Sequence, residues 1–362
     1  MLRVYGSRIS YYTGKLEAYL RYRGIEYALL PTEPHRRELH AGAGTVQMPI
    51  VRLEDDRWMS DSTPILAWLD PRQGAPSIYP TDPAMRFVAL LLEDHADEWL
   101  WRPAMHMRWS HRLDRDHASG LLADELLEHL RMPRFLKRRM LVRRQHGGFV
   151  AGDGVTPRTR AHVEASILHA FEGLEAVLAR RRFLLGDRPS VADFGFMGPM
   201  FRHLAQDPTP ADWMRARAPG VYAWVGRMWN ARAEAGAGEL LAEPDPPVVA
   251  LLVEACETHL VQLRENAHAF ARGRSRYDQT IQGCRYAAIP ASRYRVWCLE
   301  RLREDWAALD EAARARLRAA LPEREASVLW RDDAVPVASG YDPERRAPFN
   351  RAINVFGRGV PA

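Results

Sequence analysis

The chain has few cysteines. Its 362 residues include only three, Cys256, Cys284 and Cys298, and all of them lie in the last third of the sequence. There is no Cys-x-x-Cys pair, and an odd number cannot form a complete set of disulfides. A disulfide-stapled fold is therefore disfavoured, and reduced thiols in the cytoplasm are expected. The plain structural role for Cys284 and Cys298 is that of small buried residues.

The sequence also lacks a long apolar run. No stretch of about 18 or more apolar residues occurs, and no signal-peptide-like apolar region follows Met1, so neither membrane spanning nor secretion is expected. The net charge is only +5, which is too small an excess to predict a polyanionic partner. With 47% hydrophobic and 27% charged residues, the composition is that of a soluble globular protein of two or three domains.

One segment carries a complete helix-start signature. Gly186 and Pro189 end an apolar run, and Ser190 can cap the helix that follows. The carboxylate of Asp193 can reach back to the Ser190 amide, which would make a capping box. This pattern predicts a fixed, buried helix start. Any Ser-x-x-Asp has the same mechanics, so the motif alone assigns no function.

The N-terminus predicts a strand, a helix and a second strand. Residues 2–5 form a short strand-like run, and residues 13–23 carry apolar side chains at helical spacing. Gly24 closes that helix before the run 25–30. The order is therefore βαβ.

A second group of elements follows a helical linker. Pro49 directly precedes the strand-like run 50–53, where it fits a tight turn or a cis peptide bond. A turn leads to the short run 58–60, after which Asp61 and Ser62 can cap a further helix. These elements add ββα to the unit.

Together the two regions resemble one protein family. The string 183–194 resembles the capping box and following helix of the all-helical domain of glutathione transferases. The order of elements in residues 1–70 resembles the thioredoxin-like domain of the same family. The resemblance implies an α/β thioredoxin-like N-terminal domain followed by an all-α helical domain. Beyond them lies an α-rich C-terminal extension that the common family pattern does not need.

Proline clusters predict the boundaries. We expect the thioredoxin-like glutathione-binding domain over 1–70, a linker over 71–83 and the helical transferase domain over 84–243. The cluster Pro244-Asp245-Pro246-Pro247 precedes a helical extension of unknown role over 248–362. The tail from Trp330 is expected to be irregular. Amphipathic patterns predict helices over 85–101, 123–146, 159–181, 248–270 and 294–321.

Several hydroxyl groups lie between the first strand and the first helix. The family holds the glutathione sulfur as a thiolate. Lowering a thiol pKa by about two units needs about 2.7 kcal/mol, which one hydrogen bond to a charged group can supply. Ser10 falls where serine-type transferases carry their activating serine, although it can also be a simple cap. Tyr11 replaces the proline that often follows, so Tyr11, Tyr12 or Thr13 are alternatives, and Tyr5 lies near the position of the tyrosine-type phenol.

The resemblance also implies how glutathione, the co-substrate, is bound. The backbone of Met48, just before Pro49, would pair with the cysteinyl part like an added strand. Amides at the following helix start, with the Ser62 hydroxyl, would bind the γ-glutamyl carboxylate, and Asp61 would meet the ammonium group. The plain alternative is that Asp61 and Ser62 only cap their helix.

The segment 99–111 is dense in aromatic, methionine and histidine side chains, and in the family this helix lines the substrate pocket. Such a stripe is more often core. Arg102, Arg108 and His106 are candidates for orienting an anionic or polar electrophile. The histidines at 95, 106, 111 and 117 lack metal-ligand spacing with carboxylates or cysteines, so no metal is expected. The predicted pocket residues are Trp101, Met105, His106 and Trp109.

The segment 131–144 is the strongest run of basic charge in the chain. It could bind nucleic acid or another anionic surface. The favoured interpretation is a solvated helix face. In that interpretation the apolar residues turned inward are Phe135, Leu136, Met140 and Leu141.

The leading hypothesis is a cytosolic serine-type glutathione transferase acting on a hydrophobic small-molecule electrophile. Conjugation, dehalogenation, ether cleavage and isomerisation share the same first step. The alternative is a non-catalytic transferase-like module that binds proteins through its extension. Family members are usually dimers joined along the domain boundary, so a homodimer is expected, unless the extension covers that surface or roofs the active site. Neither nucleic acid nor membrane is an expected partner.

Overall fold

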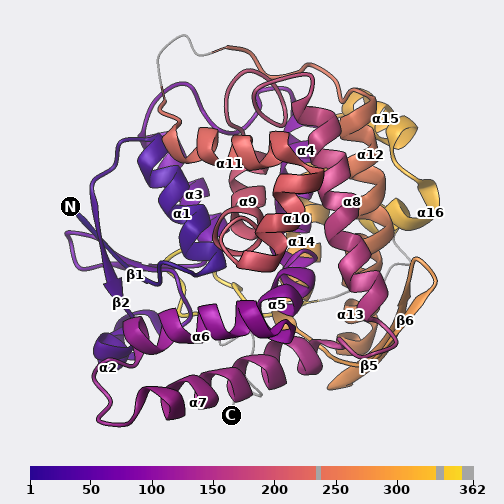
Figure 1. Ribbon diagram of the computed structural model, residues 1–362. Coiled ribbons are helices and arrows are strands. Elements are labelled where there is room, and N and C mark those ends of the chain that lie inside the picture. The colour runs from indigo at the N-terminus through magenta and orange to yellow at the C-terminus, as the bar shows by residue number, and fades with distance from the viewer. Residues whose placement is uncertain (234–237, 332–337, 353–362) are drawn as a thin grey trace.

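The computed structural model describes residues 1–233, 238–331 and 338–352 (Figure 1). Its N-terminal unit has a four-stranded sheet in the order β2-β1-β3-β4. β1 is parallel to β2 and antiparallel to β3, and β3 is antiparallel to β4. This is the predicted thioredoxin-like arrangement. Its elements are β1 (Leu2–Gly6), α1 (Tyr11–Tyr22), β2 (Tyr27–Pro31), α2 (Arg36–Ala43), β3 (Ile50–Arg52), β4 (Trp58–Ser60) and α3 (Ser62–Leu69).

Alternation along the strands explains how the sheet is covered. Val4, Val51 and Met59 lie in the main core, on the side of α1 and α3. Tyr5 and Ile50 point to the opposite face and pack with buried residues of α2. Because successive side chains of a strand face opposite ways, each short strand contributes to both layers.

The helical part begins at α4 and contains the predicted capping box. The Ser190 amide donates to Asp193 Oδ2 at 2.9 Å, and the other carboxylate oxygen accepts from the Leu184 amide at 2.9 Å. The helices are α4 (Pro83–Glu98), α5 (Trp101–Ser110), α6 (Arg112–Leu126), α7 (Arg134–Gln145), α8 (Arg160–Leu178), α9 (Val191–Pro199), α10 (Pro208–Arg217) and α11 (Pro219–Asn230).

The prediction of one amphipathic stretch over 123–146 is wrong. α6 ends at Leu126, and α7 begins at Arg134, immediately after Pro133. Proline disfavours helical backbone in the residue before it, so the chain turns between the two helices. Apolar periodicity continued across this break and concealed it.

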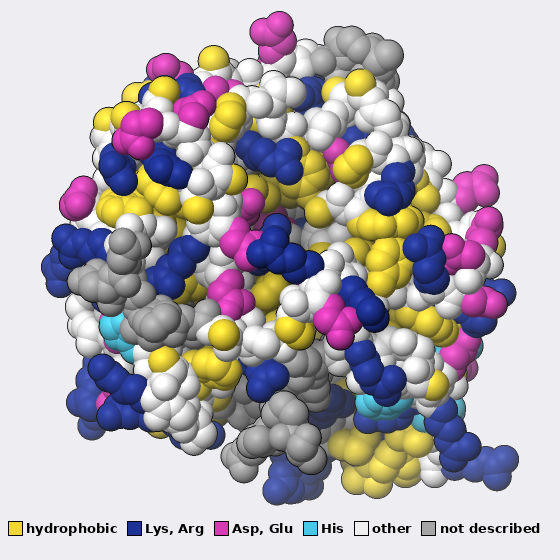
Figure 2. Space-filling view, turned by 180° about the vertical axis from the view of Figure 1, so that it is seen from behind, with side chains coloured by type: hydrophobic (Ala, Val, Ile, Leu, Met, Phe, Trp, Pro, Cys, Tyr) yellow, Lys and Arg dark blue, Asp and Glu magenta, His cyan; other side chains and the backbone are white. Residues whose placement is uncertain are grey.

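The inward face predicted for the basic segment is also wrong. On α7 only Leu141 is buried, and the Phe135 side chain is 67% exposed. Arginines face α6 instead: Arg134 pairs with Asp124 at 2.7 Å and Arg138 with Asp116 at 3.0 Å. Over the face drawn in Figure 2, basic, acidic and apolar side chains are intermixed.

The extension is built around two helix pairs and a hairpin. The hairpin between residues 276 and 290 was not predicted, although Gln282-Gly283 is a two-residue turn with positive φ at both positions. The elements are α12 (Pro246–Ala255), α13 (Val261–Ala271), β5 (Arg276–Ile281), β6 (Cys284–Pro290), α14 (Arg293–Ala307), α15 (Glu311–Ala320) and α16 (Glu323–Ala326). Residues 332–337 and 353–362 of the predicted irregular tail lie outside the described residues.

α4 is the central helix of the molecule. Most of its residues are buried, because it contacts α9 on one face and α12, α14 and α15 of the extension on others. The rings of Phe87 and Trp306, from α4 and α14, pack edge to face with centroids 5.3 Å apart. One cluster of buried side chains runs from Val4 to Leu329. We propose that the predicted domain boundaries divide the sequence, and that the domains on both sides of each boundary contribute side chains to this shared core.

The described cysteines are free thiols. Cys256 and Cys298 are buried and Cys284 is half-buried, and burial raises the pKa of all three. Within the described ranges, no helix combines the length and apolar character needed to cross a membrane.

Candidate functional site

The loop between β1 and α1 is held by side chains of the helical part. Glu125 of α6 accepts from the Ser7 hydroxyl at 2.6 Å and from the Arg8 amide at 3.0 Å. Arg108 of α5 donates to the Ile9 carbonyl at 2.6 Å and pairs with Asp207 at 2.7 Å. Arg108 therefore fixes the loop that precedes Ser10, and its guanidinium is committed to this task.

Ser10 is the N-cap of α1. Its backbone is extended, and its hydroxyl accepts from the Thr13 amide at 3.4 Å. The distance is at the long end for a hydrogen bond, so the hydroxyl is loosely held. It lies at the positive end of the α1 dipole, where an anion is stabilised.

The hydroxyls of Tyr11 and Tyr12 point away from the cap and into the α4 layer. Tyr11 donates to the Ala96 carbonyl, and Tyr12 donates to the Asp97 carbonyl at 3.0 Å. Burial raises the pKa of both phenols well above the usual range. Gly198 of α9 permits this packing, because a Cβ there would lie 2.5 Å from the Tyr11 ring. Both phenols are thus neutral donors to backbone.

The predicted glutathione-binding positions lie at two turns of the same sheet. The bond from Met48 to Pro49 is cis, immediately before β3. Asp61 caps α3, accepting from the Thr63 amide at 3.3 Å, and Ser62 is buried as the first residue of that helix. Asp61 has φ +72°, a left-handed conformation that costs a non-glycine residue about 1–3 kcal/mol. Strained backbone of this kind is common at functional sites, so the start of α3 is a candidate site.

The extension reaches this turn. The Tyr294 hydroxyl of α14 donates to Asp61 Oδ2 at 2.8 Å, and burial raises the pKa of Asp61 to about 7. The Ser60 amide, on the outer edge of β4, donates to the Pro348 carbonyl at 3.0 Å. Nothing in the sequence pattern pointed to Tyr294 or Pro348, since both are far from Asp61 along the chain.

The same C-terminal segment continues across the domain. The Phe349 ring packs edge to face on Trp68 of α3, with centroids 5.1 Å apart. The Ala352 amide donates to the Ala43 carbonyl at the end of α2 at 3.0 Å. Residues 348–352 therefore run from the start of α3 to the loop that leads to Met48.

Three of the four predicted pocket residues lie together, because Trp101 packs against the apolar cluster that contains Met105 and Trp109. Trp101 stacks on the Tyr12 ring with centroids 5.4 Å apart. Met105 and Trp109 are buried in a second apolar cluster that includes Ile9. His106 lies against Glu164 of α8, on a different side of α5. Trp101 contacts the rings of both Tyr11 and Tyr12.

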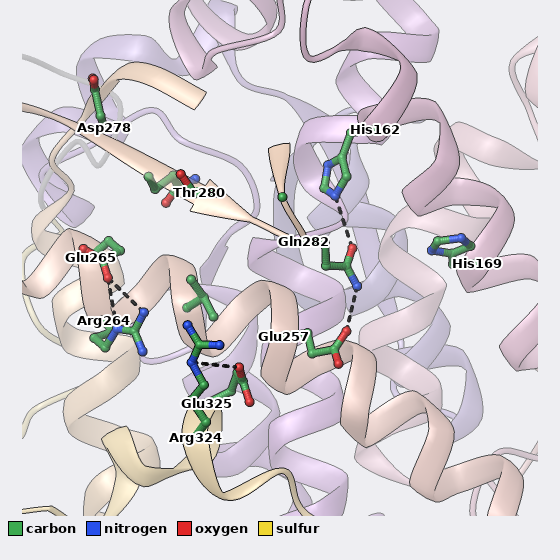
Figure 3. A pocket seen from close by; sticks show the side chains of 13 residues that line it. His162, His169, Glu257, Arg264, Glu265, Asp278, Thr280, Gln282, Arg324 and Glu325 are labelled. Atoms are coloured by element: carbon green, nitrogen blue, oxygen red, sulfur yellow. Dashed lines mark hydrogen bonds and ion pairs between the residues drawn. The ribbon is translucent and has the colours of Figure 1, made fainter. Parts of the chain in front are cut away.

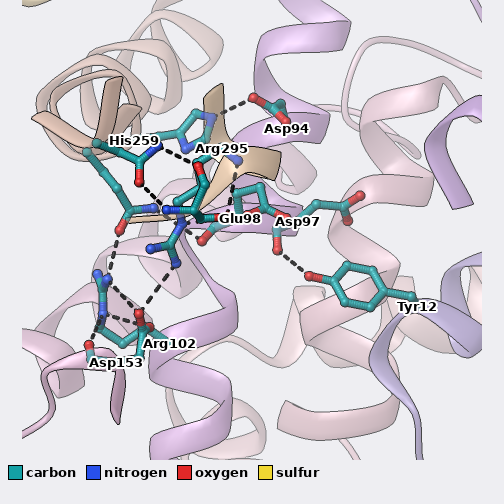
Figure 4. Close-up of polar contacts among 11 residues, drawn as sticks. Tyr12, Asp94, Asp97, Glu98, Arg102, Asp153, His259 and Arg295 are labelled. Atoms are coloured by element: carbon teal, nitrogen blue, oxygen red, sulfur yellow. Dashed lines mark hydrogen bonds and ion pairs between the residues drawn. The ribbon is translucent and has the colours of Figure 1, made fainter. Parts of the chain in front are cut away.

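Arg102, a candidate for electrophile binding, is instead part of a buried polar network (Figure 4). Its guanidinium lies 3.0 Å from Asp153 and 2.8 Å from the Gln262 oxygen. Arg295 of α14 lies between Asp153, at 3.5 Å, and Glu98, at 3.8 Å. Burial raises the pKa of Glu98 to about 8. This network joins the extension to α4 and α5.

Histidines and a carboxylate do converge in space. His106, His111 and Glu164 offer three ligand atoms within 4.8 Å of one another. The expectation of no metal rested on spacing along the chain, and that criterion missed the group because Glu164 comes from α8. A metal-ligand set assembled from separate helices leaves no local signature.

A hollow of about 900 Å³ lies in the extension, between α8, α13, α16 and the β5–β6 hairpin (Figure 3). Its lining is polar and carries both signs of charge. None of the predicted site residues borders it. The labelled lining residues in Figure 3 are His162, His169, Glu257, Arg264, Glu265, Asp278, Thr280, Gln282, Arg324 and Glu325.

Solved structures with similar folds include glutathione transferases of low sequence identity. A glutathione S-transferase from Rhodospirillum rubrum F11 is 17% identical, with a TM-score of 0.42, and the match covers 70% of this chain and 92% of that one. The β-etherase LigF from Sphingobium sp. strain SYK-6 is 20% identical, with a TM-score of 0.44, over 63% of this chain and 94% of that one. No curated protein sequence matches the chain.

Two family models match the sequence itself. Residues 4–77 match the N-terminal domain of glutathione S-transferases, and residues 157–227 match their C-terminal domain. The first range holds the sheet with Ser10, Pro49 and Asp61, and the second holds the capping box of α9. The chain therefore contains the N-terminal thioredoxin-like domain and the C-terminal helical domain of glutathione S-transferases, followed by an additional C-terminal extension.

Proposed function

We propose that this protein activates the thiol of glutathione for attack on a hydrophobic electrophilic small molecule. Ser10 is the proposed catalytic residue. Its hydroxyl lies at the start of α1, whereas the hydroxyls of Tyr11 and Tyr12 are committed to backbone carbonyls. The N-cap position of Ser10 carries the proposal, because a helix N-terminus adds about 0.3–1 kcal/mol in favour of a nearby anion.

Glutathione would bind between the turn before Pro49 and the start of α3. The Met48 backbone would pair with its cysteinyl part, and the α3 amides with the Ser62 hydroxyl would bind its γ-glutamyl carboxylate. The two Asp61 oxygens each accept one hydrogen bond, and each can accept another from the ammonium group. Trp101 would border the electrophile.

The test is calorimetric titration of glutathione into the full chain in two buffers of different ionisation enthalpy. We expect binding with proton release near neutral pH. Ser10→Ala should keep the binding and lose the proton release, because the thiol then stays protonated. Tyr12→Phe is the matched control and should release protons like the wild type. Equal proton release by Ser10→Ala would refute the role of Ser10.

A second candidate function is a non-catalytic module. It is favoured by the extension's own contacts with the proposed glutathione site, where Tyr294 donates to Asp61 and Pro348 accepts from Ser60. In this candidate the site is a docking surface for the extension. Absence of glutathione binding in both the wild type and Tyr294→Phe would favour the module. Tighter glutathione binding by Tyr294→Phe would favour the transferase, with Tyr294 as a competitor.

The oligomeric state and location are part of the same proposal. Resemblance to the family predicts a homodimer. Because α12, α14 and α15 cover α4, the extension can instead take the place of a second subunit. A dimer in sedimentation velocity would support the first arrangement, and a monomer the second.

The three free thiols support a reducing compartment, and we propose the cytoplasm.

A further inference from the structure

We propose that His106, His111 and Glu164 form a binding site for a divalent transition-metal ion. The three residues come from α5, from the junction of α5 and α6, and from α8. Two imidazoles and one carboxylate suit Zn²⁺, Co²⁺, Ni²⁺ or Cu²⁺ rather than Mg²⁺ or Ca²⁺. The site is independent of the proposed glutathione site, whose residues belong to the N-terminal sheet.

The distances between ligand atoms fit one small ion. Glu164 Oε1 lies 3.0 Å from His106 Nε2 and 3.7 Å from His111 Nε2. Ligands bound to Zn²⁺ at 2.0–2.2 Å in a tetrahedron lie about 3.4 Å from one another. The observed separations lie on either side of that value, so small side-chain rotations suffice.

His111 supplies an independent observation. Its Nε2 is buried and has no hydrogen-bond partner among the described residues, since Glu164 is too distant at 3.7 Å. A buried polar atom left in this way is costly, and an ion at this point would satisfy it. The His111 and Glu164 side chains are 21% and 24% exposed, so water can complete the coordination.

His106 is already oriented for metal binding. Its Nδ1 lies 2.8 Å from the Ser110 hydroxyl, which can accept a hydrogen bond from Nδ1–H and leave the Nε2 lone pair for the ion. The His106 side chain is buried, and its Nε2 lies toward Glu164 Oε1.

Arg160 is the competitor for the ion. It lies 2.8 Å from the same Glu164 oxygen, one helical turn away on α8, and its side chain is 54% exposed. An exposed pair of this kind is weak, so the arginine can swing into solvent when the ion binds. Removing it should therefore tighten metal binding, which is an unusual result for a mutation at a site.

The experiment uses the full chain without a histidine tag, stripped with a chelator and titrated with ZnCl₂ in a calorimeter. We expect one ion per chain. His111→Ala and Glu164→Gln should each weaken binding at least tenfold, and Arg160→Ala should strengthen it. His169→Ala, on the same helix but outside the group, should bind like the wild type. Circular dichroism of each variant checks that it is folded.

A second readout is the visible spectrum of the Co²⁺-loaded chain. A four-coordinate site with nitrogen ligands gives d–d bands that free Co²⁺ lacks, and His111→Ala should abolish them. The proposal is overturned if the wild type takes up no Zn²⁺ at tenfold molar excess. It is equally overturned if uptake is the same in the wild type, His111→Ala and Glu164→Gln.

Discussion

Lys15 connects three helices through its single charge. It is one of two lysines in the chain, its side chain is 0% exposed, and it pairs with Glu93 and Asp97 of α4 while donating to Thr63 of α3 at 2.9 Å. Two carboxylates are thus buried against one ammonium group. Removing the cation would leave both without compensation.

We expect Lys15→Met to lower the free energy of unfolding at pH 7 by about 3–5 kcal/mol. The difference in unfolding free energy between the variant and the wild type should become smaller at acid pH. Burial raises the pKa of Asp97, and the protonated, neutral carboxyl group needs no cation beside it. Urea unfolding at two pH values measures both effects. Lys137→Met, on the surface of α7, is the matched control and should change stability by less than about 0.5 kcal/mol. Similar losses in the two variants would contradict the role of Lys15.

Asp61 makes stability depend on pH in a defined direction. Its pKa is about 7 in the folded chain and near 3.8 when exposed, so the folded state binds more protons between these values. Its contribution is therefore fully present below about pH 4 and is lost as the pH rises through 7. Asp61→Asn, which also tolerates positive φ, should lose less stability than the wild type between pH 5 and pH 8. Denaturant unfolding across this range would show parallel curves if the carboxyl were unimportant.

At the scale of elements, α7 is the helix whose buried and exposed faces differ from those that its sequence pattern predicts. Phe135 and Met140 are exposed, while Arg134 and Arg138 face the acids of α6. Apolar side chains that bury nothing contribute little to stability. The ion pairs with α6 therefore take the place of a packed apolar seam.

We expect Phe135→Ser to change the free energy of unfolding by less than about 0.5 kcal/mol, since the ring is already in water. Leu141 is buried, so Leu141→Ser should lower the free energy of unfolding by at least about 2 kcal/mol. Thermal unfolding of the two variants compares them directly. A large loss for Phe135→Ser would mean that the ring is covered in solution.

Sequence patterns predicted those elements whose signals are local. The thioredoxin-like order, the turn at Pro49 and the capping box at Asp193 each depend on neighbouring residues, and all are present. The orientation of α7 and the convergence of His111 with Glu164 depend on which helix packs where. No periodicity along the chain encodes such contacts, because they join segments that are distant in sequence.

At the scale of the whole molecule, the extension and the transferase domains share one core. Trp306 packs on Phe87 of α4 and on Trp330 within the extension. Arg295 adds a buried polar link to Glu98. Most of α4 is buried, and it obtains part of its cover from α12, α14 and α15.

Trp306→Ala should therefore destabilise the transferase core as well as the extension, by about 3–5 kcal/mol. We expect faster hydrogen exchange at the amides of α4 in this variant, measured by mass spectrometry. Tyr222→Ala, which removes an exposed ring from α11, is the control and should leave α4 protected. Exchange that accelerates only within α14 and α15 would show that the extension unfolds by itself.

The hydrogen bond from the Ser60 amide to the Pro348 carbonyl also has a consequence for the order in which the chain is synthesised and folds. Residues 2–60 are synthesised before residue 348, so the outer edge of β4 gains this partner only after the intervening chain has been translated. Until then the nascent sheet presents an open edge of the kind that recruits foreign strands. Ribosome-bound chains arrested before residue 338 should be more prone to aggregate than completed chains. The sheet is thus made well before the segment that covers its edge.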